Sequence, residues 1–170
     1  MKIENMEDLF MEQIEDLYDA EKRLIKALPK MAEASTSSQL RQAFESHLEQ
    51  TKGHASRLER IFGELGKDAK TQTCDAMKGL ISEGEDMISD IEESPLRDAG
   101  LIAAANRVEH YEIAAYGSAK AFAQALGRNS AVALLEQTLQ EEKEADQKLT
   151  RLAESMINDE ALRPSPVDAR

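Results

Sequence analysis

The sequence has few of the residues that mark β-structure, disulfide-rich folds or frequent turns. Tryptophan is absent, aromatic residues make up 4% of the 170 residues, and there are only 8 glycines and 4 prolines. No β-branched run bounded by turn residues occurs, which argues against β-strands. Cys74 is the single cysteine, so an intramolecular disulfide bond is excluded. The abundant residues, chiefly alanine, leucine, glutamate and lysine, favour α-helices.

The sequence also lacks an excess of positive charge and any long apolar run. Lysine and arginine total 21 against 33 aspartates and glutamates, which gives a formal net charge of −12. This acidity argues against binding to nucleic acid or to an anionic membrane surface, because both need clustered cations. No apolar run approaches the roughly 20 residues of a membrane span. Residues 1–10 have no basic start, so we expect no signal peptide and a cytoplasmic protein.

Apolar periodicity and boundary signals predict five helices in a single domain over residues 1–160. Asn5 and the Ser94–Pro95 pair are typical helix starts, and Gly66 and Gly127 are typical stops. The expected helices span residues 6–34, 39–65, 74–92, 95–126 and 129–158. Residues 161–170 are expected to form a flexible tail.

The order of helix lengths predicts the fold class. Two long helices joined by a short turn come first, then a long connection with a short helix, then a second long pair. Short turns make antiparallel neighbours, and one long connection suits a single crossover. We therefore predict an all-α, ferritin-like antiparallel four-helix bundle with a long crossover that carries a short fifth helix.

Each long helix carries an apolar stripe that is interrupted by polar residues near its middle. Four of these residues lie about 15 residues from the nearest short turn, and at about 1.5 Å of rise per residue they fall in one layer. The interrupting residues are Glu21, His47, Thr51, His54, Glu112 and Glu142. Adjacent positions on the same faces add Tyr18, Gln50, Glu109, Tyr116 and Asp146.

Several carboxylates buried in one layer need compensation, because each unpaired one costs several kcal/mol. Lysine and arginine are missing from all four stripes, so divalent metal ions are the expected counter-charges. Carboxylate and imidazole groups suit iron, manganese or zinc, and we expect one or two ions, with iron favoured. The predicted ligands are Glu21, His47, His54, Glu109, Glu112, Glu142 and Asp146; Tyr18, Gln50, Thr51 and Tyr116 are expected to support them.

Other interpretations of these residues stay open. A single core glutamate is often a protonated or hydrogen-bonded structural residue, and a core histidine often has only a packing role. Cys74 lies on an apolar stripe and is typical of core packing. The glutamates that fall off the stripes are expected to be solvated; they are Glu49, Glu136, Glu141 and Glu144.

Four segments carry a resemblance to a known family. They are residues 16–22 (DLYDAEK), 47–51 (HLEQT), 103–117 (AAANRVEHYEIAAYG) and 141–149 (EEKEADQKL). They resemble the YciE/YciF family of bacterial stress proteins, and most closely its YciF branch. That resemblance covers nearly the whole chain. It implies a fold similar to rubrerythrins and other ferritin-like di-iron proteins, a role in stress, and a homodimer.

The wider ferritin-like pattern has a glutamate on the first and third helices and an E-x-x-H motif on the second and fourth. Three positions match it, namely Glu21, Glu112 and Glu142. Ala145 stands where the last histidine is expected, and Asp146 is the expected substitute. The second helix departs as well, because Lys52 stands three residues after Glu49, and the inward polar residues are His47, Gln50 and His54.

Two functions fit these residues. The first is a di-iron oxidoreductase that reacts with peroxide or dioxygen, as a peroxidase or ferroxidase would. The second is a stress protein that holds a metal ion or a hydrogen-bonded polar layer without turnover. A DNA-binding mini-ferritin is disfavoured by the net charge and by the lack of a basic tail. No residue is assigned a catalytic role beyond the metal ligands.

Overall fold

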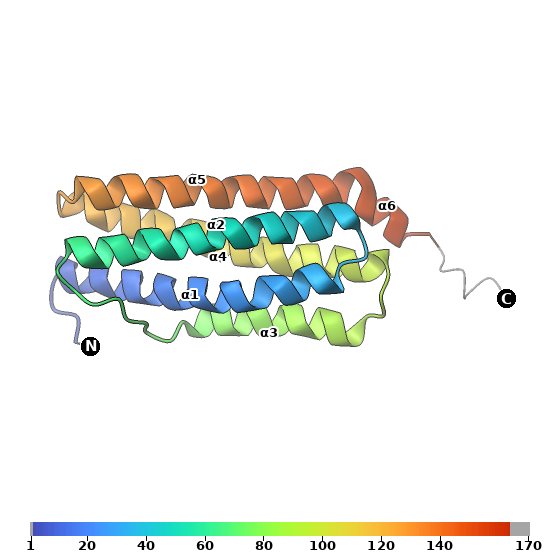
Figure 1. Cartoon of the computed structure of the whole chain (residues 1–170), viewed down its shortest axis with the longest axis horizontal. Coiled ribbons are helices and arrows are strands. Elements are labelled where there is room, and N and C mark those ends of the chain that lie inside the picture. The colour runs from blue at the N-terminus through green and yellow to red at the C-terminus, as the bar shows by residue number, and fades with distance from the viewer. Residues whose placement is uncertain (1, 164–170) are drawn as a thin grey trace.

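The computed structural model describes residues 2–163, and that part of the chain contains helices and no β-strand. Its helices are α1 (Met6–Ala34), α2 (Ser38–Glu64), α3 (Asp75–Asp90), α4 (Pro95–Ala125), α5 (Asn129–Leu152) and α6 (Asn158–Ala161), with a π-helical turn at Ala153–Ile157. Figure 1 shows four long helices side by side, with α3 along one edge. The predicted all-α fold is confirmed. Residues 164–170 of the expected tail lie outside the described residues.

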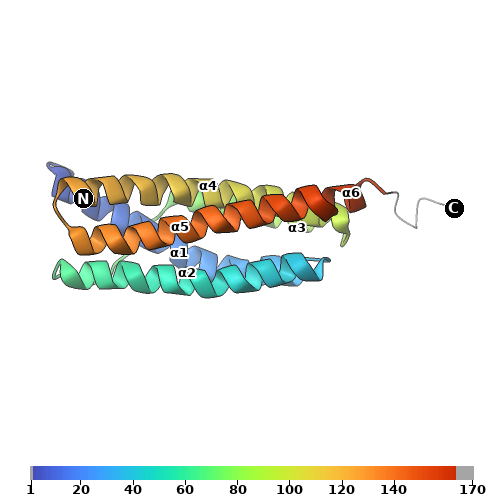
Figure 2. The same ribbon diagram turned by 90° about the horizontal axis from the view of Figure 1, so that it is seen from above.

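The four long helices form an antiparallel bundle. Helix α1 packs against α2 and α4, and α5 packs against the other side of the same two helices, so the cyclic order is α1, α2, α5, α4. Figure 2 shows α5 between α2 and α4 when the bundle is turned. Helix α3 runs in the crossover from α2 to α4 and packs on α1 and α4. None of the described helices is long and apolar enough to cross a membrane.

The helix boundaries follow the signals in the sequence. The Asn5 side chain accepts a hydrogen bond from the Asp8 amide at the start of α1, and Ser94 does the same for Arg97 at the start of α4. The turns after α2 and α4 contain Gly66 and Gly127, each with a positive φ that side-chain-bearing residues rarely adopt. These predicted ends are confirmed within one or two residues.

Two boundaries differ from the prediction. Cys74 caps α3 from outside, because its sulfur accepts a hydrogen bond from the Met77 amide, so the helix begins at Asp75. The last helix passes through the π-helical turn and continues to Ala161, beyond the expected end. Ile157, in the last turn of the predicted helix, is fully buried and belongs to the same core cluster as Leu101 and Leu149.

The apolar stripes pack as two clusters, one toward each end of the bundle. One cluster includes Phe10, Leu17, Leu58, Tyr116 and Leu135; the other includes Leu24, Phe44, Leu101, Val108 and Leu149. On every long helix the interrupting polar residues lie at the change from one cluster to the other. Glu21, Thr51, Glu112 and Glu142 are each fully buried. We call this set, together with His47, His54 and Glu109, the polar layer.

Asp98 ties the start of α4 to the turn between α1 and α2. Its two carboxylate oxygens accept hydrogen bonds from the amides of Thr36 (2.8 Å) and Ser37 (2.7 Å), and the side chain is almost fully buried. The neighbouring Arg97 guanidinium donates to the carbonyl of Ala34. This end of the bundle is therefore held by charge-assisted hydrogen bonds.

We predict that Asp98→Ala lowers the free energy of unfolding by about 2 to 4 kcal/mol, because the amides of Thr36 and Ser37 lose a charged acceptor. Asp98→Asn keeps one acceptor oxygen and should lose less. Urea denaturation followed by circular dichroism would measure both. The control is Glu93→Ala, since the Glu93 side chain is 72% exposed. An Asp98→Ala protein as stable as the control would contradict this account.

Candidate metal centre

The first group of converging side chains lies between α2, α4 and α5. It comprises His47, Glu109, Glu112 and Glu142, whose candidate ligand atoms all lie within 4.8 Å of one another. The Nε2 atom of His47 is 3.3 Å from an oxygen of Glu109 and 3.5 Å from Oε2 of Glu142. All four residues are buried. One imidazole and three carboxylates therefore face a common point in the dry interior.

The second group adds α1 and shares one residue with the first. Its members are Glu21, His54 and Glu142. The Nδ1 atom of His54 is 2.8 Å from Oε1 of Glu142 and 3.4 Å from Oε1 of Glu21. The Tyr116 hydroxyl donates a hydrogen bond to Glu21. Because its two oxygens face different histidines, Glu142 joins the two groups into one centre.

In each histidine, the ring nitrogen that does not face the converging group contacts an acceptor outside it. His47 Nδ1 lies 3.2 Å from the side-chain oxygen of Gln50, a neutral acceptor. His54 Nε2 lies 2.8 Å from Oε2 of Glu141. Arg57 donates one hydrogen bond of 2.8 Å to each of the two carboxylate oxygens of Glu141. Such outer contacts fix the tautomer of a ligating histidine and the plane of its ring. They leave His47 Nε2 and His54 Nδ1 directed at the polar layer.

The inward atoms come close together without making hydrogen bonds. Among the described residues, no hydrogen-bond partner is found for His47 Nε2, His54 Nδ1, Glu21 Oε2, Glu109 Oε2 and both oxygens of Glu112 and of Glu142. The short distances between them are therefore contacts of charge, not aligned hydrogen bonds. Buried polar atoms are normally hydrogen-bonded. Converging donors that do not satisfy one another fit a bound cation, so these buried histidines and glutamates could hold a metal ion.

Without a cation the histidines compensate the carboxylates by holding protons. Burial alone would lower the pKa of His47, but Glu109 and then Glu142 outweigh burial and raise it to about 9. Burial likewise opposes the charge of His54, but contacts with Glu142 and Glu21 raise its pKa to about 10. A metal ligand must be a neutral imidazole, so metal binding at neutral pH would release these protons.

The pKa values of the buried glutamates are raised as well, in their case by burial itself. Burial, helped by the charge of Glu109 and opposed by His54, raises the pKa of Glu142 to about 7. Burial and the charges of Glu142 and Glu21 raise the pKa of Glu112 well above its usual value. Burial also raises the pKa of Glu21, although His54 works against it. In the metal-free protein the acids therefore take up protons easily. A bound cation would compensate their negative charge and release these protons.

Most of the predicted supporting residues also lie at the centre. Tyr116 and Gln50 make the contacts described above, and the Thr51 hydroxyl donates to the backbone carbonyl of His47 at 2.8 Å. Tyr18 does not contribute to the polar layer, because its hydroxyl donates to Glu59 at 2.7 Å.

Asp146, a predicted ligand, is not in either converging group. Its Oδ1 accepts a hydrogen bond of 2.6 Å from Asn106 and lies 3.2 Å from Nε2 of His110, whose side chain is 70% exposed. Asp146 lies four residues after Glu142 and therefore only about 40° from it around the helix, but its carboxylate is directed to Asn106 on α4 instead of to the polar layer. Asp146 thus does not occupy the place left by Ala145.

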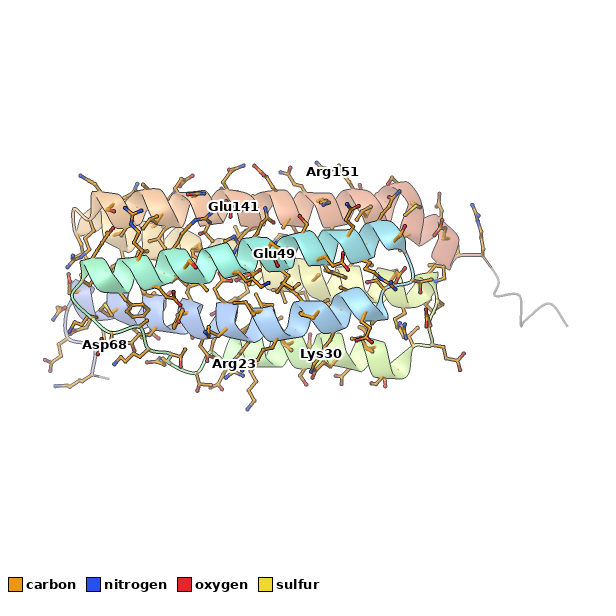
Figure 3. All side chains as sticks on the ribbon, viewed as in Figure 1. Arg23, Lys30, Glu49, Asp68, Glu141 and Arg151 are labelled. Atoms are coloured by element: carbon orange, nitrogen blue, oxygen red, sulfur yellow. The ribbon has the colours of Figure 1, made fainter. Side chains whose placement is uncertain are left out.

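The apolar spacing did not assign Glu141 or Arg57 to the centre. We predicted Glu141 to be a solvated surface residue, yet its side chain is only 22% exposed and bridges α5 to α2. Figure 3 shows Glu141 on α5, while Glu49 on α2, 69% exposed, is solvated as predicted. The usable signal was spacing: Arg57 lies three residues after His54, and Glu141 lies directly before Glu142.

Comparisons with known proteins cover almost the whole chain. Residues 5–162 match the family model described as "Domain of unknown function (DUF892)". The chain is 44% identical over 162 residues to Protein YciF of Escherichia coli strain K12. The aligned region covers 95% of this chain and 98% of that protein. The predicted resemblance to the YciE/YciF family is confirmed.

Solved structures share the fold. The crystal structure of the stress protein YciF of Escherichia coli matches with a TM-score of 0.88, over 92% of this chain and 99% of that one. YcfI from Rhodopseudomonas palustris, 42% identical, matches with a TM-score of 0.86 over 88% and 95%. A protein of Xanthomonas campestris pv. campestris, only 19% identical, matches with a TM-score of 0.71 over 91% and 94%, which shows a common fold alone.

The raised pKa values of the polar layer predict that the metal-free protein loses stability as the pH rises. Each group binds its proton more tightly in the folded chain, so the free energy of unfolding falls with pH. The contribution of Glu142 is lost as the pH rises from 4.5 through about 7, and those of His47 and His54 from 6.5 through about 9 and 10.

Melting temperatures of chelator-treated protein, taken between pH 5 and pH 9 (about the span of these pKa values), would measure this loss. His110→Gln is the matched control, because the His110 side chain is exposed; it should leave the profile unchanged. A melting temperature that stays level or rises over that range would contradict the charge balance described here.

Proposed function

The chain belongs to the DUF892 family, and we propose that it is a stress-related protein that binds one or two metal ions, iron in the first place, in its polar layer. The supporting observation is the convergence of buried imidazole and carboxylate atoms without hydrogen-bond partners among the described residues. The link to stress rests on YciF, the relative described as a stress protein.

Charge balance supports two ions. The layer holds four buried carboxylates, those of Glu21, Glu109, Glu112 and Glu142, and two imidazoles. Two divalent cations would neutralise four carboxylates with both histidines neutral. Because the interior screens charge poorly, a net charge near zero is strongly favoured there. The shared position of Glu142 suits a carboxylate that serves both ions.

The donor set favours iron or manganese over softer metals, because it is rich in carboxylate and contains no thiolate. A pair of ferrous ions would supply the two electrons that reduce one peroxide, with two protons, to two waters. The residues of the chain would hold the ions and exclude bulk water. Tyr116, whose pKa is raised well above its usual value by burial and by Glu21, stays a neutral hydrogen-bond donor.

We predict that Glu142→Ala abolishes binding of the second ion and severely weakens the first, because Glu142 belongs to both converging groups. Glu112→Ala should act in the same direction. Glu49→Ala is the matched control, since the Glu49 side chain is 69% exposed and pairs with Lys52. Anaerobic Fe(II) titration with elemental analysis would measure stoichiometry and affinity. If Glu49→Ala proved the more damaging change, the proposed centre would be wrong.

We also predict that Glu141→Gln weakens metal binding by about 10-fold to 100-fold, the usual cost of losing an outer carboxylate behind a ligating histidine. The amide is neutral and cannot keep the paired contact with Arg57, so His54 loses both its orientation and part of its basicity. Glu144→Gln is the control, because Glu144 is exposed on the same helix. Equal affinities for the two variants would show that Glu141 does not position His54.

A second function, a metal-binding or structural stress protein without turnover, is supported by the histidine protonation. With His47 and His54 charged, the layer offsets part of its own negative charge, and the raised pKa of Glu112 works in the same direction. Mixing the ferrous protein with peroxide under anaerobic conditions distinguishes the redox function from the function without turnover. Rapid formation of a ferric absorbance band supports the redox function. Tightly bound metal with no such band, or full stability after chelation, supports the second.

A further inference from the structure

A small cavity lies between α2 and α5 beside the polar layer. Its volume is about 30 Å³. Ser46 and Lys148, which line it, are exposed, whereas His47 and Glu109, which also line it, are 6% and 2% exposed. The cavity therefore connects the surface of the bundle with the first converging group.

The inner end of the cavity is formed by side chains that carry hydrogen-bonding atoms without partners. In the described part of the chain, neither His47 Nε2 nor Glu109 Oε2 has a hydrogen-bond partner. Both belong to side chains that are more than nine-tenths buried. A small molecule with a hydroxyl group at this end of the cavity would lie next to the two side chains that carry these atoms.

The size and charge of the cavity define what it can admit. A water molecule needs about 10 to 15 Å³ by this measure, so the space holds one or two such molecules and no organic substrate. Phe44 and Leu149 supply apolar walls. Lys148 stands at the exposed side and repels a divalent cation, while a neutral molecule passes it freely.

Ala145 makes this space available, because this small residue lines the cavity on α5, one turn before Lys148 and Leu149. Protein interiors are close-packed, so a larger side chain here would fill a cavity of this size. The access depends on one small residue, which makes it open to test.

We propose that this cavity is the route by which water-sized neutral molecules, with hydrogen peroxide as the substrate class, reach the His47–Glu109 side of the centre. The substrate assignment rests on the proposed function, but the route itself does not. The route is a property of the folded chain, whether or not an ion is bound.

The first experiment uses metal-free protein and the slow exchange of deuterium onto the imidazole carbon between the two nitrogens, read by mass spectrometry. In the wild type, His47 should exchange several-fold faster than His54, which is fully buried and does not line the cavity. Ala145→Leu should slow His47 several-fold and leave His54 unchanged. Ala145→Val, a smaller change, should give an intermediate rate. Ala133→Leu, at an exposed position of the same helix, is the control and should match the wild type.

The second experiment measures peroxide reaction in Fe(II)-loaded protein after metal affinity has been matched. Ala145→Leu should bind Fe(II) as the wild type does and react with peroxide several-fold more slowly, whereas Ala133→Leu should react normally. Unchanged His47 exchange in Ala145→Leu would overturn the route. Slowed exchange with an unchanged peroxide rate would overturn the substrate class. A wild type that binds no metal would refute the proposed function, and the exchange result would still decide the route.

Discussion

The burial of four carboxylates at one height of the bundle is the constraint on which the rest of the structure depends. Taking a charged carboxylate out of water costs far more than one helix contact returns, so the layer exists only with its charge compensated. The two histidines, the tyrosine hydroxyl on Glu21 and the raised pKa values of the acids are partial answers. None of these groups makes a hydrogen bond with Glu112, whose two oxygens remain without hydrogen-bond partners in residues 2–163.

The two histidines are supported differently, and the difference makes the centre asymmetric. His54 rests on a carboxylate that is itself clamped by Arg57, so its ring is oriented firmly and made more basic. His47 rests on the neutral amide of Gln50 and borders a cavity. One side of the centre is therefore rigid and closed, and the other is adaptable and close to solvent. That division suits a site in which an ion is held on one side and a small molecule arrives on the other.

Features that repeat along the sequence could be predicted, whereas features that depend on one contact between helices could not. The helices, their caps and the layer at Glu21, Glu112 and Glu142 followed from apolar spacing and distance to the turns. Glu109 and Asp146 both lie beside an apolar stripe, and the sequence could not separate them. The structure brings Glu109 to His47 and turns Asp146 toward Asn106. The pairing of Glu141 with Arg57 arises where α2 meets α5, and no local pattern records such a meeting.

The crossover helix gives the bundle a thick wall and a thin wall. Helix α3 packs on α1 and α4 over the half of the bundle that holds Leu24 and Leu101, so on that side a second layer of helix covers the core. On the opposite side, α2 and α5 stand alone. A tag, dye or surface tether attached to α3 would thus remain remote from the chemistry. The same attachment along the seam between α2 and α5 would lie over Glu141 and beside Lys148, which lines the cavity. There it would change the access of small molecules to the polar layer.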